Sequence, residues 1–375
     1  MDPSPSLPPG LVRPALAAVE PYEPGRPIEE VRRESGLASV IKLASNEGPF
    51  GPFPAALEAL ERAARELNRY PDGGAYRLRT ELAARLGVRF EEVAVGAGAD
   101  GLIDCLCQAT LGPGDETVFG WPSFASYMID TVKQGATPRP IPLREHRYDL
   151  EAMREAITAR TKLVFICLPN NPTGTMNTRS ELDAWLDDVP DHVLTVVDQA
   201  YFEYLEDPDY PDAIAEYRGA GPRILVLRTF SKLYGLAGLR VGYGISAAPV
   251  ISAIGKVKRA FDVSHPAQAA ALASLGNEAE LEHRRRLNLA GREQLLAVLR
   301  AHGLRPAGPA VANFLYVDVG EDSKPFFEQL LREGVIVRPL HGFGAPGAVR
   351  ITVGTEEENA FLDRALGRIG APAAA

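Results

Sequence analysis

The chain places one lysine, Lys232, where a solvated surface lysine is not usually found. It follows the apolar run 224–227 and the segment Arg-Thr-Phe-Ser, and the chain then continues Leu-Tyr-Gly-Leu-Ala-Gly. If that run is a buried strand, the ammonium group lies at the carboxyl end of a sheet, where α/β proteins bind ligands. A lysine in such a place can have a lowered pKa and form a Schiff base with a carbonyl compound. Taken alone, the pattern also fits an ordinary surface lysine.

A carboxylate ends a second predicted strand. Asp198 follows the apolar run 193–197, and Tyr201 comes three residues later. A buried carboxylate needs a cationic partner or hydrogen bonds, so Asp198 is a candidate to face a cationic ligand atom. In isolation, a role as the N-cap of a helix explains the residue equally well.

Two further turns carry polar or flexible groups. The run 169–174, Pro-Asn-Asn-Pro-Thr-Gly, follows the apolar run 163–168, so Asn171 lies at a strand end and can reach a ligand oxygen. The run 96–101, Gly-Ala-Gly-Ala-Asp-Gly, precedes a helical pattern, and free backbone N–H groups at a helix start bind phosphate. This second run lacks the rest of the dinucleotide-binding pattern, so it is weak evidence by itself.

The elements that position these residues alternate between strand and helix. Apolar runs indicate buried strands at 93–95, 163–168, 193–197, 224–227 and 239–245. Helical periodicity appears at 54–69 and 77–86, and Thr178 with Glu181 forms a capping box for another helix. This alternation predicts an α/β fold with a mostly parallel sheet.

The pattern of predicted helices and strands changes after residue 263. A long helical pattern at 267–298 is followed by strand-like runs at 314–317, 335–338 and 349–353 and by a closing helix at 356–369. This α+β region predicts a second, smaller domain. We expect residues 1–45 to form an N-terminal arm and part of the small domain, residues 46–265 the large domain, and residues 266–375 the C-terminal small domain.

Composition excludes several classes of protein. The chain has 375 residues, of which 46% are hydrophobic and 24% charged, as in ordinary globular enzymes. Its net charge of −9 argues against general nucleic-acid binding, which needs a basic surface. The three cysteines fit a reducing compartment, and Cys105 and Cys107 have no second pair at ligand spacing, so we expect no metal site.

No targeting or spanning segment is expected. The first ten residues lack the basic and apolar regions of a signal peptide, and no run of about 18 apolar residues occurs in the chain. We therefore expect a cytoplasmic protein that is not bound to membranes.

Together these features meet the requirements of pyridoxal 5′-phosphate (PLP). In their order along the chain, residues 98–100, 171–174, 198–201, 231–232 and Arg240 resemble the fold-type I, class I/II PLP-dependent aminotransferases. Within that family the segments 21–26, 41–47, 70–74, 237–240 and 349–354 resemble histidinol-phosphate aminotransferases, and the resemblance runs from about residue 12 to 369. It implies a seven-stranded, mostly parallel sheet in a large PLP-binding domain beside a smaller α+β domain.

The resemblance also implies roles for the residues around the cofactor ring. Lys232 would hold PLP covalently and later act as the base. Asp198 would keep the pyridine nitrogen protonated, which makes the ring an electron sink. Asn171 and Tyr201 would bind the phenolic oxygen, and Phe124 would stack on the ring.

For the phosphate, the family pattern implies the Ala99 and Asp100 amides, Thr229, Ser231 and Arg240. Tyr70 matches a tyrosine that relatives place on the phosphate of the partner subunit, which implies a homodimer with composite sites.

Substrate recognition is expected to depend on arginines, whose planar guanidinium groups suit carboxylates. Arg350 matches the family's carboxylate-binding arginine. Arg338 and Tyr22 match positions that hold a distal phosphate or side-chain carboxylate, although a surface arginine and a packing tyrosine are the alternatives. Asn46 lies in the N-terminal segment near the active site.

Three departures from the family pattern concern the pocket. Gln199 stands where glutamate is usual, Gly48 where asparagine is usual, and Phe124 where tyrosine is common. Phe124 can still stack on the ring. We expect the first two to lie at the pocket edge and to bear on substrate identity.

The function implied is transfer of the amino group from L-histidinol phosphate to 2-oxoglutarate, giving imidazole-acetol phosphate and L-glutamate, as a step of histidine biosynthesis. One alternative is an aminotransferase for aromatic or other amino acids. Another is a PLP-dependent decarboxylase of an amino-acid phosphate. A transcription regulator with an aminotransferase-like domain would need a basic helix-turn-helix extension, for which the short Pro-rich start leaves no room.

Overall fold

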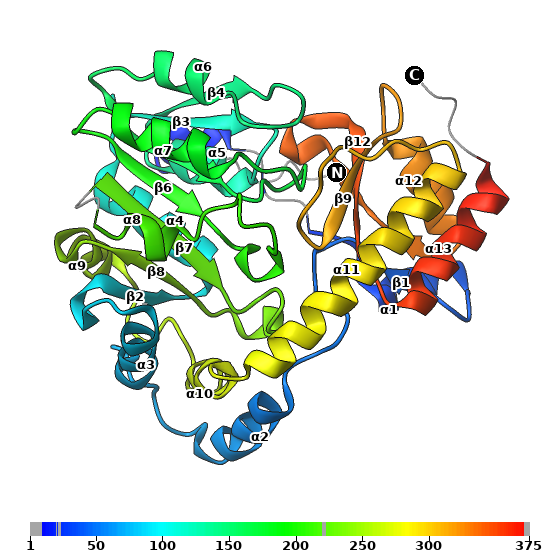
Figure 1. Cartoon of the computed structure of the whole chain (residues 1–375), viewed down its shortest axis with the longest axis horizontal. Helices are drawn as coiled ribbons and strands as arrows, with labels where there is room; N and C mark the ends of the chain where they lie inside the picture. The colour runs from blue at the N-terminus through cyan, green and yellow to red at the C-terminus, as the bar shows by residue number, and fades with distance from the viewer. Residues whose placement is uncertain (1–9, 20, 22–23, 220–222, 371–375) are drawn as a thin grey trace.

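The computed structural model describes residues 10–19, 21, 24–219 and 223–370. It divides into a large domain built on a broad sheet and a smaller domain beside it. The long helix α11 (Glu278–Ala301) runs diagonally from near α10 up into the smaller domain (Figure 1). None of the helices within the described residues is long and apolar enough to cross a membrane.

The large sheet has seven strands in the order β2-β8-β7-β6-β5-β3-β4. All neighbouring pairs are parallel except those of β8, which runs antiparallel to β2 and β7. The strands are β2 (Val93–Gly96), β3 (Glu116–Trp121), β4 (Thr137–Pro142), β5 (Thr161–Cys167), β6 (Leu194–Asp198), β7 (Ile224–Thr229) and β8 (Gly242–Ser246). The predicted α/β fold with a mostly parallel seven-stranded sheet is confirmed.

Helices connect these strands and cover the sheet. They are α2 (Pro54–Ala63), α3 (Tyr76–Leu86), α4 (Gly98–Thr110), α5 (Ala125–Lys133), α6 (Leu150–Glu155), α7 (Arg179–Asp188), α8 (Ala213–Tyr217), α9 (Ala248–Val257) and α10 (His265–Ser274). The predicted capping box at the start of α7 is present, because Thr178 accepts from the Glu181 amide and Glu181 accepts from the Thr178 amide. Helix α4 packs against both α5 and α9.

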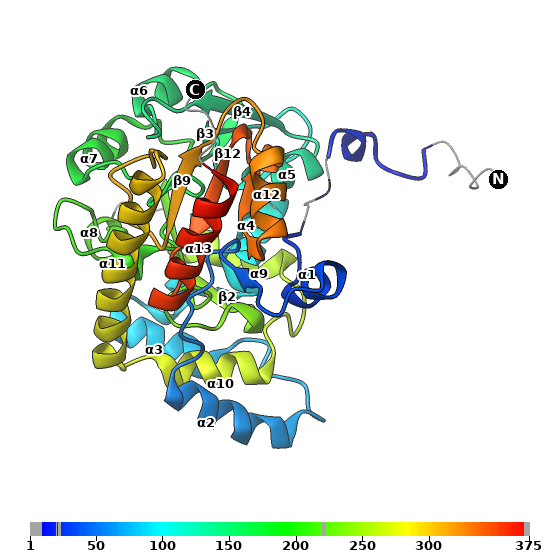
Figure 2. The same ribbon diagram turned by 90° about the vertical axis from the view of Figure 1, so that its right-hand side faces the viewer.

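The small domain combines residues from both ends of the chain (Figure 2). Strands β11 (Arg338–Leu340), β12 (Ala345–Thr352) and β9 (Phe314–Asp318) form an antiparallel sheet, and β1 (Ile41–Lys42) pairs in parallel with β10 (Val335–Ile336). Helices α1 (Ile28–Ser35), α12 (Lys324–Arg332) and α13 (Glu356–Ile369) complete it with α11.

Each domain has its own hydrophobic core. The large core surrounds the seven-stranded sheet, while a separate cluster joins α11, α12 and α13 to β9 and β12. Ala267, Ala270 and Ala271 of α10 belong to the large core. Packing therefore associates α10 with the large domain, although the predicted boundary follows the first residue of this helix, His265.

The prediction of a single helix at 267–298 is wrong. The structure breaks it into α10 and α11, because Gly276 takes a left-handed backbone conformation with φ of 82°. The predicted helix at 54–69 is also too long, since α2 ends at Ala63 and a 3₁₀ turn, η2 (Ala64–Glu66), follows. Similarly, the predicted strand at 239–245 begins only at Gly242, after the 3₁₀ turn η6 (Ala237–Leu239).

Candidate active site

A cavity of about 170 Å³ lies at the carboxyl ends of β5, β6 and β7. The structure brings most of the predicted site residues to its wall. They are Asn46, Ala99, Asp100, Phe124, Asn171, Asp198, Tyr201, Thr229, Ser231, Lys232, Arg240 and Arg350. Because the sheet and the α4 start are in the large domain whereas Arg350 is on β12, both domains contribute to the cavity.

Lys232 lies three residues after the end of β7 and lines this cavity. Burial, with the positive charge of Arg350 as the next contribution, lowers the pKa of Lys232 to about 7. Its Nζ atom lies 5.3 Å from the centre of the Tyr201 ring. A substantial fraction of this amine is therefore neutral near pH 7 and able to attack a carbonyl carbon.

Asp198 ends β6 and is only 3% exposed. Its Oδ2 atom accepts a 2.7 Å hydrogen bond from the Tyr127 hydroxyl, and its Oδ1 atom accepts one of 3.1 Å from the Ala200 amide. Burial raises the pKa of Asp198. The alternative of a helix N-cap at Asp198 is excluded, since the next helical turn, η4 (Phe202–Tyr204), begins four residues later behind Tyr201. A cationic ligand atom in the cavity would stabilise this buried carboxylate.

Asn46 orients the Tyr201 side chain. Its side-chain Nδ2 atom donates to the Tyr201 hydroxyl at 2.9 Å, and its backbone N–H donates to Thr352 Oγ1 at 3.0 Å. Asn46 has φ of 54°, a left-handed conformation that asparagine tolerates better than most residues. Burial raises the pKa of Tyr201, so its hydroxyl remains protonated at neutral pH.

Arg350 joins the small domain to the strand-end loop of β5. One of its guanidinium nitrogens donates to Asn171 Oδ1, and the other donates to the Ala44 carbonyl at 2.8 Å. The guanidinium carbon lies 5.4 Å from the Phe314 ring centre and 5.5 Å from that of Phe343. This side chain is 4% exposed and lines the cavity, so solvent would screen little of its attraction for an anionic ligand there.

The start of α4 forms a compact anion cradle with the segment after β7. Thr229 Oγ1 donates to Ser231 Oγ at 3.0 Å, and Arg240 donates to the same Ser231 oxygen at 3.4 Å. A Cβ atom at Gly98, where φ is 79°, would lie 2.8 Å from an Arg240 nitrogen, and one at Gly242 would lie 2.5 Å from the Ala99 amide nitrogen. Only glycine allows this close approach. As a result, the N–H groups at the start of α4 lie close to the Thr229 and Ser231 hydroxyls and to the Arg240 guanidinium group.

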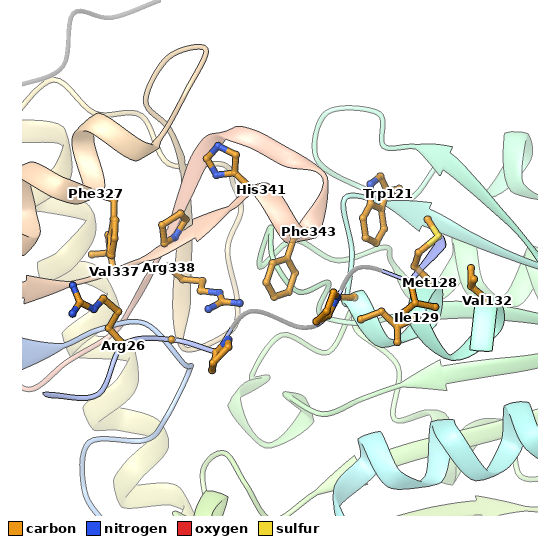
Figure 3. Close-up of a pocket in the computed structure, with 17 residues that line it drawn as sticks. Arg26, Trp121, Met128, Ile129, Val132, Phe327, Val337, Arg338, His341 and Phe343 are labelled. Atoms are coloured by element: carbon orange, nitrogen blue, oxygen red, sulfur yellow. The ribbon is translucent and has the colours of Figure 1, made fainter. Parts of the chain in front are cut away.

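A second cavity, of about 520 Å³, lies between α5 and the small domain (Figure 3). Its walls include Trp121, Met128, Ile129 and Phe343, and Arg338 points into it. Phe343 lines both cavities. The larger cavity therefore offers apolar surface and the guanidinium groups of Arg338 and Arg26 beside the smaller one.

Arg338 and Arg350 lie opposite each other on the paired strands β11 and β12. Residues directly opposite on neighbouring strands project to the same face of a sheet. Arg338 is 8% exposed and its guanidinium carbon lies 5.5 Å from the Phe343 ring centre. The alternative of a surface arginine at this strand is therefore wrong.

One predicted residue, Tyr22, lies outside the described residues. Another, Tyr70, lines neither cavity. Tyr70 is 83% exposed and stacks on Phe261, with ring centres 4.7 Å apart. An exposed pair of stacked aromatic rings is available for contact with another molecule.

The pocket-edge expectation is wrong for Gln199. It is fully buried, and its side chain donates to the Pro211 carbonyl at 2.8 Å and accepts from Arg228 at 3.1 Å. Successive residues at a strand end face opposite sides, so Gln199 points away from the cavity that Asp198 faces. Gly48 does lie near the site, because a Cβ atom there would be 3.1 Å from the Lys232 carbonyl oxygen.

Sequence reasoning missed Tyr127 and Phe343. Tyr127 lies three residues after Phe124, a spacing that puts both side chains on one face of α5, and this spacing could have indicated it. Phe343 belongs to the 3₁₀ turn η7 (His341–Phe343), and its contacts depend on how the domains meet. Cys105 and Cys107 are both buried.

The site thus combines a lysine of lowered pKa, a buried carboxylate, two side chains that can form hydrogen bonds to a ligand oxygen, the aromatic ring of Phe124 and an anion cradle. These groups fit an aldehyde-bearing pyridine with a phosphate, which is the chemistry of PLP.

Comparisons with known proteins agree with this arrangement. The family model described as "Aminotransferase class I and II" matches residues 38–369. A histidinol-phosphate aminotransferase of Moorella thermoacetica is 44% identical over 95% of this chain and 92% of its own length. An aromatic amino acid aminotransferase of Thermobifida fusca is 46% identical over 94% of this chain and 96% of its own length.

Solved structures show the same similarity. A histidinol-phosphate aminotransferase of Sinorhizobium meliloti, in complex with pyridoxal-5′-phosphate, has a TM-score of 0.85 at 26% identity and covers 96% of this chain and 97% of its own. An aspartate aminotransferase of Thermus thermophilus with maleate has a TM-score of 0.81 at 27% identity, covering 96% of this chain and 98% of its own.

Proposed function

This chain belongs to the class I and II aminotransferases, and we propose that it binds PLP and transfers the amino group of L-histidinol phosphate to 2-oxoglutarate. The observation that carries this proposal is one cavity that joins the Lys232 amine and the Asp198 carboxylate to the Arg350 guanidinium. The first two suit the cofactor, and the third suits an anionic donor. We further propose a cytoplasmic location, since the relatives are named for reactions of small metabolites.

The cofactor, when bound, supplies an electron sink for the carbon that loses its proton. Lys232 would bind it covalently and, as a free amine, would move a proton at the substrate Cα. Asp198 would hold the proton at the ring nitrogen. Tyr201, oriented by Asn46, and Asn171 would bind the phenolic oxygen, and Phe124 would cover one face of the ring.

The anion cradle supports binding of the cofactor phosphate. The Ala99 and Asp100 amides lie in the first turn of α4, where the helix dipole favours negative charge. The Thr229 and Ser231 hydroxyls and the Arg240 guanidinium would complete the ligand set.

Two guanidinium groups on one face of the small sheet support an anionic substrate. Arg338 and Arg350 can together neutralise one doubly charged phosphate, or each can bind one carboxylate of glutamate. Phe343 and Trp121 offer apolar surface to a ring in the larger cavity. We therefore propose that the two arginines and this apolar surface bind first the amino donor and then the 2-oxo acid acceptor. Tyr22 would assist Arg338.

We also propose a homodimer in which Tyr70 reaches the cofactor phosphate of the partner subunit. Tyr70 is exposed in its own chain and stacks on Phe261, which is 45% exposed. An exposed pair of aromatic rings supports association.

Replacement of Lys232 tests the proposed function. Lys232→Ala should lose the visible absorption band of the bound cofactor and reduce kcat by about 10²- to 10⁴-fold or more, because the covalent attachment and the base are both removed. Lys162→Ala, at an exposed position of β5, is the control and should retain both. A Lys232→Ala protein with normal turnover would exclude the proposal.

The aromatic amino acid aminotransferase among the relatives favours a second candidate, an aminotransferase for aromatic donors. Relative rates on phosphorylated and aromatic donors separate the two. A decarboxylase would instead release carbon dioxide and turn over without a 2-oxo acid acceptor.

A further inference from the structure

The N-cap and the first turn of α5 contact the wall of the small cavity through three side chains. Phe124, which immediately precedes the helix, lines the cavity itself. Ser126 donates to Asp100 at the start of α4, and Tyr127 donates to Asp198 at the end of β6. One helical turn is therefore linked to the ring-covering, phosphate-binding and nitrogen-facing parts of the proposed cofactor site.

Tyr127 is held rigidly behind the cavity. It is fully buried and its ring stacks on Phe165 of β5, with centres 4.5 Å apart and planes 9° apart. Phe124 meets the same ring edge-on at 5.7 Å and 84°. Since aromatic contacts fix the ring on both sides, the hydroxyl is presented to Asp198 in a set direction.

The hydrogen bond matters because Asp198 is otherwise poorly solvated. Each carboxylate oxygen accepts one protein donor, Ala200 N–H at Oδ1 and Tyr127 O–H at Oδ2. Burial raises the pKa of Asp198, whereas the hydrogen bond from Tyr127 opposes that rise. Burial, followed by the charge of Asp198, raises the pKa of Tyr127 well above its usual value, so Tyr127 stays a donor.

We propose that Tyr127 is a positioning residue, which keeps Asp198 ionised and correctly oriented and so determines how firmly the cofactor's ring nitrogen retains its proton. The inference rests on the proposed function, in which Asp198 faces that nitrogen. Tyr127 itself does not line the cavity and so acts only through Asp198.

Tyr127→Phe removes the hydroxyl and keeps the stacked ring. In the holoenzyme reconstituted with PLP labelled with ¹⁵N in its ring, the ¹⁵N chemical shift reports protonation directly. We expect the wild-type nitrogen to be protonated at pH 8 and the variant nitrogen to shift towards the unprotonated value. We also expect kcat to fall about tenfold, which corresponds to about 1.4 kcal/mol of barrier, with KM changed much less.

Two controls separate positioning from packing. Tyr217→Phe removes a hydrogen bond of the same length, 2.7 Å, from a tyrosine to Asp183 at the surface, and should change neither readout. Phe165→Leu removes one of the two aromatic contacts and keeps the hydroxyl together with the edge-on contact from Phe124, which still directs the hydroxyl to Asp198. It should lower the thermal stability of the protein and leave the ring nitrogen of the cofactor protonated. This expectation can be tested even if Tyr127→Phe folds poorly.

An unchanged ¹⁵N shift and kcat in Tyr127→Phe would overturn the inference, as would an equal shift in Phe165→Leu. Failure of the proposed function is distinguishable, because it would appear in the wild-type protein as the absence of a Lys232-dependent absorption band.

Discussion

At the scale of single residues, the site depends on charges that are brought together with little water. Lys232 lies in a cavity whose wall also carries Arg350 and Arg240, and both positive charges disfavour its ammonium form. Asp198 acts in the opposite direction but contributes less. An arginine could not replace this lysine, because a guanidinium group does not lose its proton in proteins.

The lowered pKa of Lys232 predicts a particular pH dependence. In the protein freed of PLP, labelling of Lys232 by trinitrobenzenesulfonate requires the neutral amine. The rate should rise as the pH increases through about 7 and level off above that, since deprotonation is then complete. Peptide mass spectrometry locates the label, and Lys232→Ala provides the blank. A rate that continues to rise towards pH 10, as for an ordinary lysine of pKa about 10.4, would contradict this reading.

Residues that end strands were predictable, and residues that act through packing were not. Lys232 and Asp198 are charged residues that come soon after apolar runs, so the sequence alone indicates them as candidate site residues. Tyr127 and Phe343 are aromatic residues of the kind that fill any core, and their roles appear only from contacts between elements. The direction of Gln199 was missed because it depends on which strand residue faces the cavity.

At the scale of elements, the 3₁₀ turn η7 connects the two cavities. Gly344, which follows it, has φ of 83°, and a Cβ atom there would lie 1.8 Å from the Trp121 ring nitrogen. This close contact fixes Phe343 and the start of β12 against the large domain. The glycine is therefore required both by its backbone conformation and by the space available.

Gly344→Ala should destabilise the protein by about 2–4 kcal/mol, because it combines a left-handed alanine with overpacking against Trp121. It should also raise KM for the donor, since Phe343 is displaced. Gly342→Ala is the matched control, because a Cβ atom at Gly342 would contact nothing within 4 Å. Chemical unfolding and steady-state kinetics measure both effects, and equal stabilities of the two variants would refute the argument.

Element order and type followed from the sequence better than element ends did. Short apolar runs indicated five of the seven strands of the large sheet but neither β3 nor β4, and the capping box marked the start of α7. The break at Gly276 was not indicated, because residues on both sides of it favour helix and a single glycine is tolerated in many helices. The edge strand β4 was missed because it contains Pro138, Pro140 and Pro142, which normally weaken a strand.

At the scale of the whole molecule, the site lies where two domains meet. Arg284 of α11, which is 4% exposed, reaches across to the large domain and donates to the Pro52 carbonyl at 3.3 Å. Its guanidinium carbon lies 4.4 Å from the Phe53 ring centre. Domain boundaries and subunit contacts are properties of the assembled molecule, so local sequence patterns indicate them only through resemblance.

The composite site of the proposed homodimer predicts complementation between subunits. A mixed dimer of Lys232→Ala and Tyr70→Ala chains, isolated with two affinity tags, contains one site with both residues intact if Tyr70 acts on its partner. Its activity should be about half that of the wild-type dimer, because one of two symmetric sites works.

The matched control carries both substitutions on one chain and pairs it with a wild-type chain. Each site of that dimer then lacks Lys232 or the partner's Tyr70, so its activity should be low. If Tyr70 instead served its own subunit, the order of the two activities would be reversed.

The most direct test of the central claim is a single-turnover titration of the PLP-loaded protein with an amino donor and no acceptor. Loss of the visible absorption band is followed after addition of L-histidinol phosphate and, separately, of phenylalanine. We predict rapid conversion by histidinol phosphate and slow conversion by phenylalanine, and Arg338→Gln should slow the first much more than the second. Faster conversion by phenylalanine would contradict the proposed donor, and no conversion by either would contradict the proposed reaction.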